Sequence, residues 1–224
     1  MSANEQAYTG FAGLQDVNGE WNRLQFAIRS GMAGMATTTI VLVKAVTATA
    51  DGFTVDVQPM VAQVDGAGNA VPHGTIHALP VWRVQGGNSA VVVEPAVGDI
   101  GIAVFASTDI SGVKRAGKPT TPGSARRFDW ADGIYFGGVL NAAPTQFIRL
   151  DGDGVTITAA EGLPVTVNAP GGLVVNAPTA EFSGDVAVTG SVTTGAGSTF
   201  DGIAFDSHTH SGVTTGGGNS GPPV

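Results

Sequence analysis

Residues 165–178 read Val-Thr-Val-Asn-Ala-Pro-Gly-Gly-Leu-Val-Val-Asn-Ala-Pro, and the tripeptide Asn-Ala-Pro recurs in this stretch after eight residues. Strand-like pieces of about four residues, separated by small-residue corners, extend the pattern on both sides. They are Val155–Thr158, Val165–Asn168, Leu173–Asn176, Asp185–Thr189 and Ser191–Thr194. Short strands spaced roughly eight to ten residues apart are typical of a β-helix or β-prism. The sequence therefore predicts a β-helical shaft over residues 151–206.

The predicted shaft has too little apolar mass to fold as a single chain. Apolar residues alternate within each strand, as Val165 and Val167 do, so each inward layer receives about two of them. A segment of 56 residues with so small an apolar content cannot close a stable solenoid alone. Three chains wound round a common axis would bury three times as much in each layer. We therefore predict an intertwined β-helix in an obligate homotrimer.

Charge and composition change near residue 150. The chain has 224 residues, with 34 Gly, no Cys and a formal net charge of −8. All ten Lys and Arg lie at or before Arg149, whereas residues 151–224 hold seven acids, no base and only three aromatic residues. This break predicts a domain boundary, and the lack of Cys excludes disulfides and thiolate metal sites. The acidic balance argues against a phosphate-binding surface, and we expect neither a signal peptide nor a membrane span.

Residues 37–150 read as short strands separated by Gly and Pro turns. The Asp51-Gly52 pair predicts a hairpin, and the Gly98-Asp99 turn suggests a second pairing. The expected strands are Thr38–Val46, Phe53–Val57, Val91–Val93 paired with Gly101–Phe105, Ile134–Phe136 and Gln146–Leu150. About five strands with little helix fit a small closed barrel such as an OB-fold, although a small sandwich produces the same pattern. The fold class is therefore predicted to be all-β.

A short helix is predicted in the N-terminal extension, residues 1–36. Apolar residues recur at helical spacings over residues 16–33, namely Trp21, Leu24, Ala27 or Ile28, and Met32. Asp16 or Asn18 is the expected N-cap. We expect an amphipathic helix that docks on its own domain or on a neighbouring chain.

Two histidines stand two residues apart in the C-terminal segment, residues 207–224. On a strand, His208 and His210 would point to one face and Thr209 to the other. Two imidazoles hold a metal weakly, but three copies around a threefold axis supply six nitrogens, an octahedral shell. Zinc prefers four ligands, so this shell favours Fe(II), with Ni(II) or Co(II) as substitutes. A solvated tail that binds nothing fits the same spacing, and the surrounding Gly and Pro suit either a tight apex or a frayed end.

Two regions of the chain carry a resemblance to a known family. The ending His208-Thr-His-Ser-Gly-Val213, followed by Gly221-Pro-Pro223, is close to a His-x-His…Thr-Gly-Pro-Pro tail, with Ser220 where Thr is usual. That tail is found in the membrane-puncturing central spike proteins of contractile-tailed bacteriophages, also called baseplate assembly protein V. The barrel resembles their OB-fold domain through Pro80-Val-Trp82, Gly86-Gly87, Val97-Gly-Asp-Ile-Gly101, Val104-Phe105 and Arg126-Arg-Phe-Asp129. The likeness covers about residues 40–224.

This resemblance implies a homotrimer with an OB-fold collar (37–150), a tapering β-helical shaft (151–206) and an apex (207–224). The collar would attach to the baseplate hub or the tail tube. At the apex, His208 and His210 of three chains would bind one iron ion, Fe2+, in a six-histidine site, and further ions on the axis are left open. The family acts mechanically, not as an enzyme, and pierces the outer membrane of a Gram-negative host. The protein would be made in the host cytoplasm and reside in the virion.

Two rival functions follow from other readings of the same residues. His-x-His also occurs in metal-dependent hydrolases, where distant His and Asp residues complete the site. Here His73 and His77 are the only other histidines, and we expect them to be surface or packing residues in a loop between Pro72 and Pro80. No helix–strand alternation predicts the barrel that such an enzyme needs. A trimeric adhesin that binds host glycan would share the β-helix but is expected to show aromatic or carboxylate-rich grooves on its shaft.

A third rival is an OB-fold that binds nucleic acid. A run of bases could form a patch beside Phe128 and Trp130; its members are Lys114, Arg115, Lys118, Arg126 and Arg127. The near-zero net charge of residues 1–150 argues against this function. Contact with a partner protein explains the run equally well, so we expect no nucleic acid among the partners.

Overall fold

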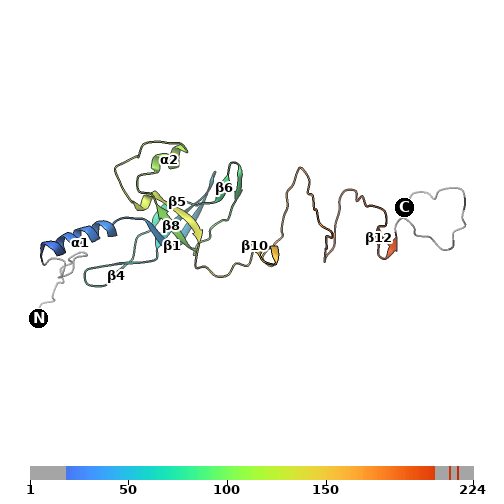
Figure 1. The fold of residues 1–224 in the computed structure, drawn as a ribbon, viewed down its shortest axis with the longest axis horizontal. Coiled ribbons are helices and arrows are strands. Elements are labelled where there is room, and N and C mark those ends of the chain that lie inside the picture. The colour runs from blue at the N-terminus through green and yellow to red at the C-terminus, as the bar shows by residue number, and fades with distance from the viewer. Residues whose placement is uncertain (1–18, 205–211, 213–215, 217–224) are drawn as a thin grey trace. The chain divides into compact units, whose positions relative to one another are not determined.

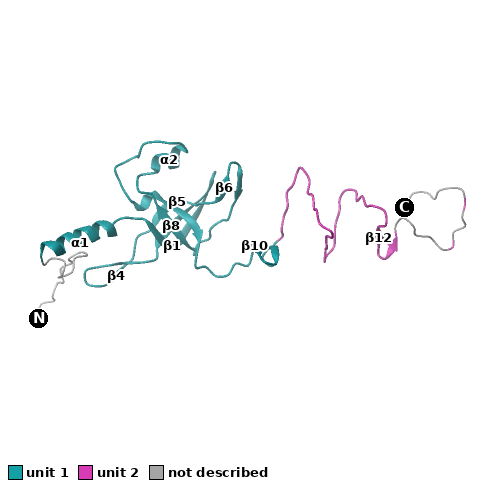
Figure 2. Cartoon of the chain, viewed as in Figure 1, with its two compact units in different colours: residues 1–163 teal, residues 164–224 magenta. Residues whose placement is uncertain are grey.

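The computed structural model describes residues 19–204 together with Gly212 and Gly216. The secondary structure is mostly β with few helices, which confirms the all-β fold class. The chain divides into two compact units, residues 1–163 and residues 164–224 (Figure 2). The predicted domain boundaries at residues 36, 150 and 206 stay predictions.

Five strands of the first unit form one closed sheet (Figure 1). In the order in which they lie side by side they are β5 (Ile76–Pro80), β2 (Gly52–Pro59), β1 (Thr38–Thr49), β8 (Ile100–Phe105) and β9 (Gly133–Gly138). All these neighbours are antiparallel. A parallel bridge between Val81 and Tyr135 closes the ring, and the Trp82 N–H donates to the Tyr135 carbonyl at 2.7 Å. The result is the expected five-stranded barrel.

The barrel encloses one apolar core. Val41 and Val43 of β1 and Val55 and Val57 of β2 line its inner face, with Val43 directly opposite Val57, and all four side chains are buried. The other buried apolar residues are Ala36, Ile76, Leu79, Ala103, Phe105 and Tyr135. The Asp51-Gly52 hairpin is confirmed, because Thr49 pairs with Gly52 at the turn.

One of the expected strand pairings is wrong. Gly101–Phe105 does not pair with Val91–Val93, because the preceding turn binds β1 instead: the Gly98 N–H donates to the Val43 carbonyl and the Val43 N–H donates to the Asp99 carbonyl. β8 therefore continues along β1, from Ile100 opposite Leu42 to Val104 opposite Thr38. Val91 instead ends β7 (Ser89–Val91), which pairs only with β6 (Val84–Gly86).

The remaining barrel strand also differs from the prediction. Residues 146–150 were expected in the barrel, but β10 (Phe147–Asp151) pairs with β11 (Gly154–Thr158). β5 takes that place, in a segment expected to be a loop. Its pattern is broken by the positive φ of Ala78 (55°) and by a register shift between Val55 and Val57 of β2. The smaller elements are β3 (Gln63–Val64), β4 (Ala70–Val71), α2 (Ser111–Ala116) and a 3-10 helix (Trp130–Asp132).

The predicted N-terminal helix is present as α1 (Glu20–Ala33), and it buries none of its residues. Its N-cap is Gly19, with no side-chain cap, and the two residues expected there, Asp16 and Asn18, lie outside the described residues. Within the described chain, no helix has the length and apolar character needed to cross a membrane. α1 keeps an exposed apolar stripe of Trp21, Leu24, Ile28 and Met32.

Candidate functional site: the unpaired strands and the C-terminal tip

The shaft segment is largely without regular pairing in the single chain. Between the end of β11 at Thr158 and β12 (Thr199–Phe200), the described residues form no strand. Four of the five predicted shaft strands are therefore unpaired here, namely Val165–Asn168, Leu173–Asn176, Asp185–Thr189 and Ser191–Thr194; Val155–Thr158 is found in β11. Backbone groups of an extended segment need partners when it is packed. Among residues 19–204 of the single chain, this segment has no partner strand.

The apolar side chains of this segment are open to solvent. Val165 is 59% exposed, Val167 65% and Leu173 70%. The same holds for Leu163, Val174, Val175, Phe182, Val186, Val188 and Val192. A run of exposed apolar residues this long is characteristic of a surface that another molecule covers.

The β10–β11 hairpin at the head of the shaft segment has the same character. Ile148 pairs with Ile157 and Leu150 with Val155, so these four side chains share one face. Each of them is more than 60% exposed. The other face carries Arg149, Thr156 and Thr158 together with Phe147. The Arg149 guanidinium lies 4.7 Å from the centre of the Phe147 ring. The hairpin thus presents a complete apolar face that nothing in the described part of the chain covers.

A tight hairpin ends the continuous described stretch of residues 19–204. β12 pairs with β13 (Ile203–Ala204) through Thr199–Ala204 and Phe200–Ile203. Asp201 and Gly202 form its two-residue turn with φ of 50° and 74°. Asp-Gly with two positive φ angles is the preferred sequence for a hairpin turn of this twist. The hairpin therefore reverses the chain at Asp201-Gly202, and Gly202 is six residues before His208 in the sequence.

His208 and His210, the predicted metal ligands, lie outside the described residues. Among the residues that are described, no group of three or more His, Cys, Asp or Glu is arranged to hold a metal ion. The chemistry of the two imidazoles fits a divalent transition metal, because neutral nitrogen donors suit iron, nickel and cobalt and no thiolate competes. The segment supplies two such donors, His208 and His210, per chain.

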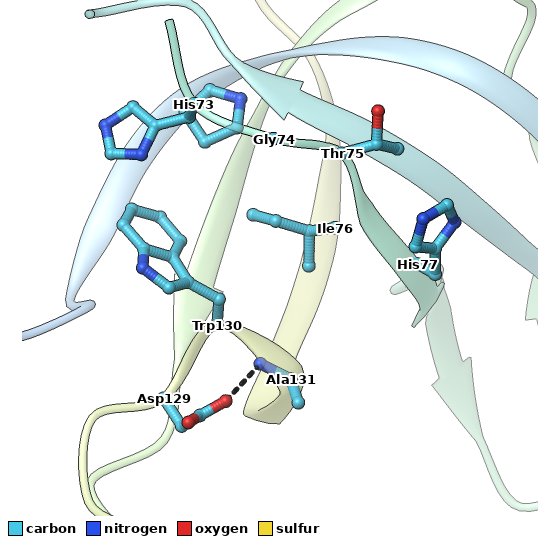
Figure 3. Close-up of a pocket in the computed structure, with 9 residues that line it drawn as sticks. His73, Gly74, Thr75, Ile76, His77, Asp129, Trp130 and Ala131 are labelled. Atoms are coloured by element: carbon cyan, nitrogen blue, oxygen red, sulfur yellow. Dashed lines mark hydrogen bonds between the residues drawn. The ribbon is translucent and has the colours of Figure 1, made fainter. Parts of the chain in front are cut away.

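The other two histidines have roles within the barrel. His73 packs on Trp130, with ring centres 5.1 Å apart, beside a cavity of about 460 Å³ (Figure 3). The His77 Nδ1 lies 2.7 Å from Asp56 Oδ2, which ties β5 to β2. The pKa of Asp56 is lowered mainly by the hydrogen bond that its carboxylate accepts from the Ala78 N–H, and secondly by the hydrogen bond with His77. His77 belongs to β5, so its expected place in a loop is wrong, but the expected packing role of His73 is confirmed.

The run of bases considered for nucleic acid is partly used inside the barrel. Arg126 donates to Asp132 through Nε (2.7 Å) and Nη2 (2.8 Å), and to Asp109 through Nη2 (2.9 Å). The Lys114 Nζ donates to the Ala131 carbonyl at 2.9 Å. Trp130 packs edge-on against Phe105 at 4.9 Å and is only partly exposed.

These contacts hold the long β8–β9 connection to the barrel. The carboxylates of Asp109 and Asp132 are buried, and Ser124 Oγ donates to Asp109 at 2.7 Å. Hydrogen bonds from Ser111 and Ser124 hold the pKa of Asp109 at about 2, and the Arg126 hydrogen bond lowers the pKa of Asp132. Sequence reasoning missed this cluster, because the basic run around Arg126 gave no sign of its two acidic partners.

Comparison with known proteins bears on the C-terminal segment. Residues 202–224 match the family model described as the GpV Apex motif. No curated protein matches the chain. The match confirms the resemblance of this segment to the tip of the phage baseplate spike. The motif belongs to a structural component of the phage tail and begins at Gly202, in the turn of the last described hairpin.

Proposed function

We propose that three copies of this chain form a membrane-piercing spike at the centre of a contractile tail. The C-terminal segment of each copy carries the tip motif of phage baseplate spikes. The match of residues 202–224 to the GpV Apex motif is the observation that carries this proposal. The spike acts mechanically: contraction of the sheath drives it through the outer membrane of the host. No bond is broken by the chain itself.

The exposed apolar residues of the shaft support the trimer. Val165 and Val167 alternate with Thr166, so one face of the extended chain is apolar and the other polar. Two further copies give the unpaired backbone its hydrogen-bond partners and also cover the apolar face. A single solenoid has open edges, whereas intertwined chains pair each strand on both sides. Such a shaft resists unfolding under load.

The barrel supports the role of a collar. Its strand order β5-β2-β1-β8-β9, closed by the parallel bridge from Val81 to Tyr135, supports an OB-fold. We place the baseplate hub or the tail tube at this end of the protein. The shaft and tip point toward the host, because residues 202–224 carry the apex motif.

His208 and His210 would hold the metal at the tip. Three chains bring six imidazole nitrogens, and iron as Fe2+ is the ion that we assign to them. A bound ion supplies a cross-link between the three chain ends. The histidines keep those ends together where a terminus would otherwise separate. Residues 151–224 carry seven acids and no base, so attraction to an anionic membrane surface contributes nothing, and penetration depends on force.

The proposal is tested by measuring the mass and the metal content of the full-length protein purified without a histidine tag. Light scattering is expected to give three times the chain mass of 22.4 kDa. Elemental analysis is expected to give one iron per three chains. A metal-free monomer at micromolar concentration would overturn the proposal. A trimer without metal would overturn the tip site and leave the intertwined shaft.

A further inference from the structure

The β6–β7 hairpin has one apolar face and one polar face. Val84 pairs with Val91, and Gln85 pairs with Ala90. Paired residues share a face, and successive residues alternate between faces, so Val84 and Val91 lie on one side and Gln85 and Ala90 on the other. Gly86 and Ser89 close the hairpin across a two-residue turn in which Gly87 has a φ of 57°.

Exposed apolar residues continue from this face toward the barrel. Trp82 stands two residues before Val84 and Val93 two residues after Val91, just outside the paired strands, and both side chains are exposed. Trp82 stacks on Phe136 of β9, with ring centres 5.3 Å apart and planes 9° from parallel. We call these five residues the hairpin patch: Trp82, Val84, Val91, Val93 and Phe136. Their exposed fractions run from 44% for Phe136 to 76% for Val93.

The polar face of the hairpin is held by its own chain. Arg83 Nη1 donates to the Asp51 carbonyl in the β1–β2 turn at 2.6 Å. The Arg83 Nε also donates to the Gln85 side chain. These contacts tie the polar side of the hairpin to the β1–β2 turn, and the apolar face stays exposed to solvent. In Figure 1 the hairpin extends beyond the barrel.

Two properties of the hairpin indicate a protein partner. All residues from Val84 to Val93 are exposed, and an isolated two-stranded hairpin is marginally stable in water. The hairpin patch contains two aromatic rings, three valines and no charge, a composition typical of the centre of a protein–protein interface. A partner that covers the patch would therefore stabilise the hairpin as well as bind to it.

The other copies in the proposed trimer supply that partner at high local concentration. β9 ends at Gly138 and β10 begins at Phe147, so eight residues join the barrel to the exposed shaft hairpin. Eight residues span at most about 29 Å. Copies joined through their shafts therefore hold their barrels within reach of one another, at an effective concentration of about millimolar. An apolar patch of modest area is then enough to hold neighbouring barrels in contact.

We propose that the hairpin patch packs against the barrel of a neighbouring copy and makes the collar one rigid ring. This inference rests on the trimer of the proposed function. It adds a contact that the shaft does not provide, because a trimer joined by shafts alone would leave three barrels free to move on their eight-residue connections.

The natural absence of cysteine allows a direct test with two single-cysteine variants of the full-length protein. Val91→Cys places a thiol in the hairpin patch, and Ala90→Cys places one on the opposite face of the same strand. Both positions are exposed in the single chain. The rate of reaction with a maleimide is measured for each, and light scattering gives the mass of the same samples.

In the trimer, the Val91→Cys thiol is expected to react at least about tenfold more slowly than the Ala90→Cys thiol, because a packed interface excludes the reagent. Equal rates in a confirmed trimer would overturn the inference and leave the proposed function intact; the patch would then be open to a different partner. A monomeric mass for the wild-type protein would overturn both. The shaft variant Val165→Asp, combined with Val91→Cys, is expected to restore fast labelling.

Discussion

The ring of Tyr135 lies against the backbone of Gly101, so closely that a Cβ at residue 101 would overlap the Tyr135 ring and the Gly137 carbonyl. Tyr135 is 1% exposed and belongs to the strand that closes the barrel. Gly101 is therefore required by close approach and not by its φ angle.

We expect Gly101→Ala to lower the free energy of unfolding of the barrel by about 3 kcal/mol, because neither the ring nor the backbone around it can move away cheaply. Urea unfolding followed by tryptophan fluorescence measures the change. Gly74→Ala is the matched control, since an added Cβ there has no atom within 4 Å. Equal stability of the two variants would show that the barrel accommodates the extra carbon.

Asp132→Asn tests the cluster that holds the β8–β9 connection. The substitution removes the charge that pairs with Arg126 but keeps an oxygen for the Ile110 N–H. We expect a loss of about 2 kcal/mol in unfolding free energy, because the guanidinium loses its main partner at a buried position. Asp129→Asn is the control: Asp129 caps the 3-10 helix by accepting from the Ala131 N–H, and Asn performs this role equally well. A control as destabilised as the test variant would contradict the assignment.

The low pKa of Asp109 predicts a dependence of stability on acid. Its pKa is held at about 2 in the folded chain, below the usual 3.8, by hydrogen bonds from Ser111 and Ser124. The unfolded chain therefore takes up this proton at higher pH than the folded chain. The stabilisation is complete above about pH 4 and is lost as the pH falls toward 2.

Asp109→Asn is expected to flatten this part of the pH profile. Urea midpoints measured at intervals from about pH 5 to about pH 2 give the slope for each protein. The variant is expected to keep a residual slope, because the pKa of Asp132 and that of Asp56 are also lowered. Identical slopes for wild type and variant would assign the acid sensitivity to those other groups.

His210→Ala is expected to remove the tip metal without separating the chains. Removing one imidazole from each copy takes away half of the six proposed donors, whereas the shaft contacts are unaffected. Elemental analysis is expected to show iron reduced to background, with the mass of the trimer retained. Thr209→Ala, between the two histidines, is the control that keeps both donors. Iron retained in His210→Ala would exclude His210 as a ligand.

Local sequence signals predicted only the local parts of the barrel. The hairpin at Asp51-Gly52 and helix α1 were found because turn residues and periodicity act over a few positions. The pairing of β1 with β8 joins residues about sixty positions apart, and no local pattern specifies it. β5 was missed because the positive φ of Ala78 and a register shift interrupt its alternation.

The candidate sites also differ in whether local sequence signals could predict them. His208 and His210 could be predicted from spacing and from their resemblance to a family tail, since both are properties of adjacent residues. The Arg126 cluster could not, because Asp109 lies seventeen residues away and only the folded connection brings the two together. The hairpin patch was also missed, because the register of Val84 with Val91 is needed to show that these two valines share a face.

The last prediction concerns the shaft. Two neighbouring residues of one predicted strand provide the test and its control. Val165 belongs to the apolar face that three chains would bury, and Thr166 belongs to the polar face. Val165→Asp places three carboxylates in one apolar layer, which costs several kcal/mol per unpaired charge, so the trimer should dissociate at micromolar concentration. Thr166→Asp adds the same charge to the solvent side and should leave the trimer intact. Sedimentation of both variants distinguishes burial from charge: loss of the trimer in both would indicate electrostatic repulsion in an already acidic shaft, and retention in both would show that residue 165 lies outside the interface.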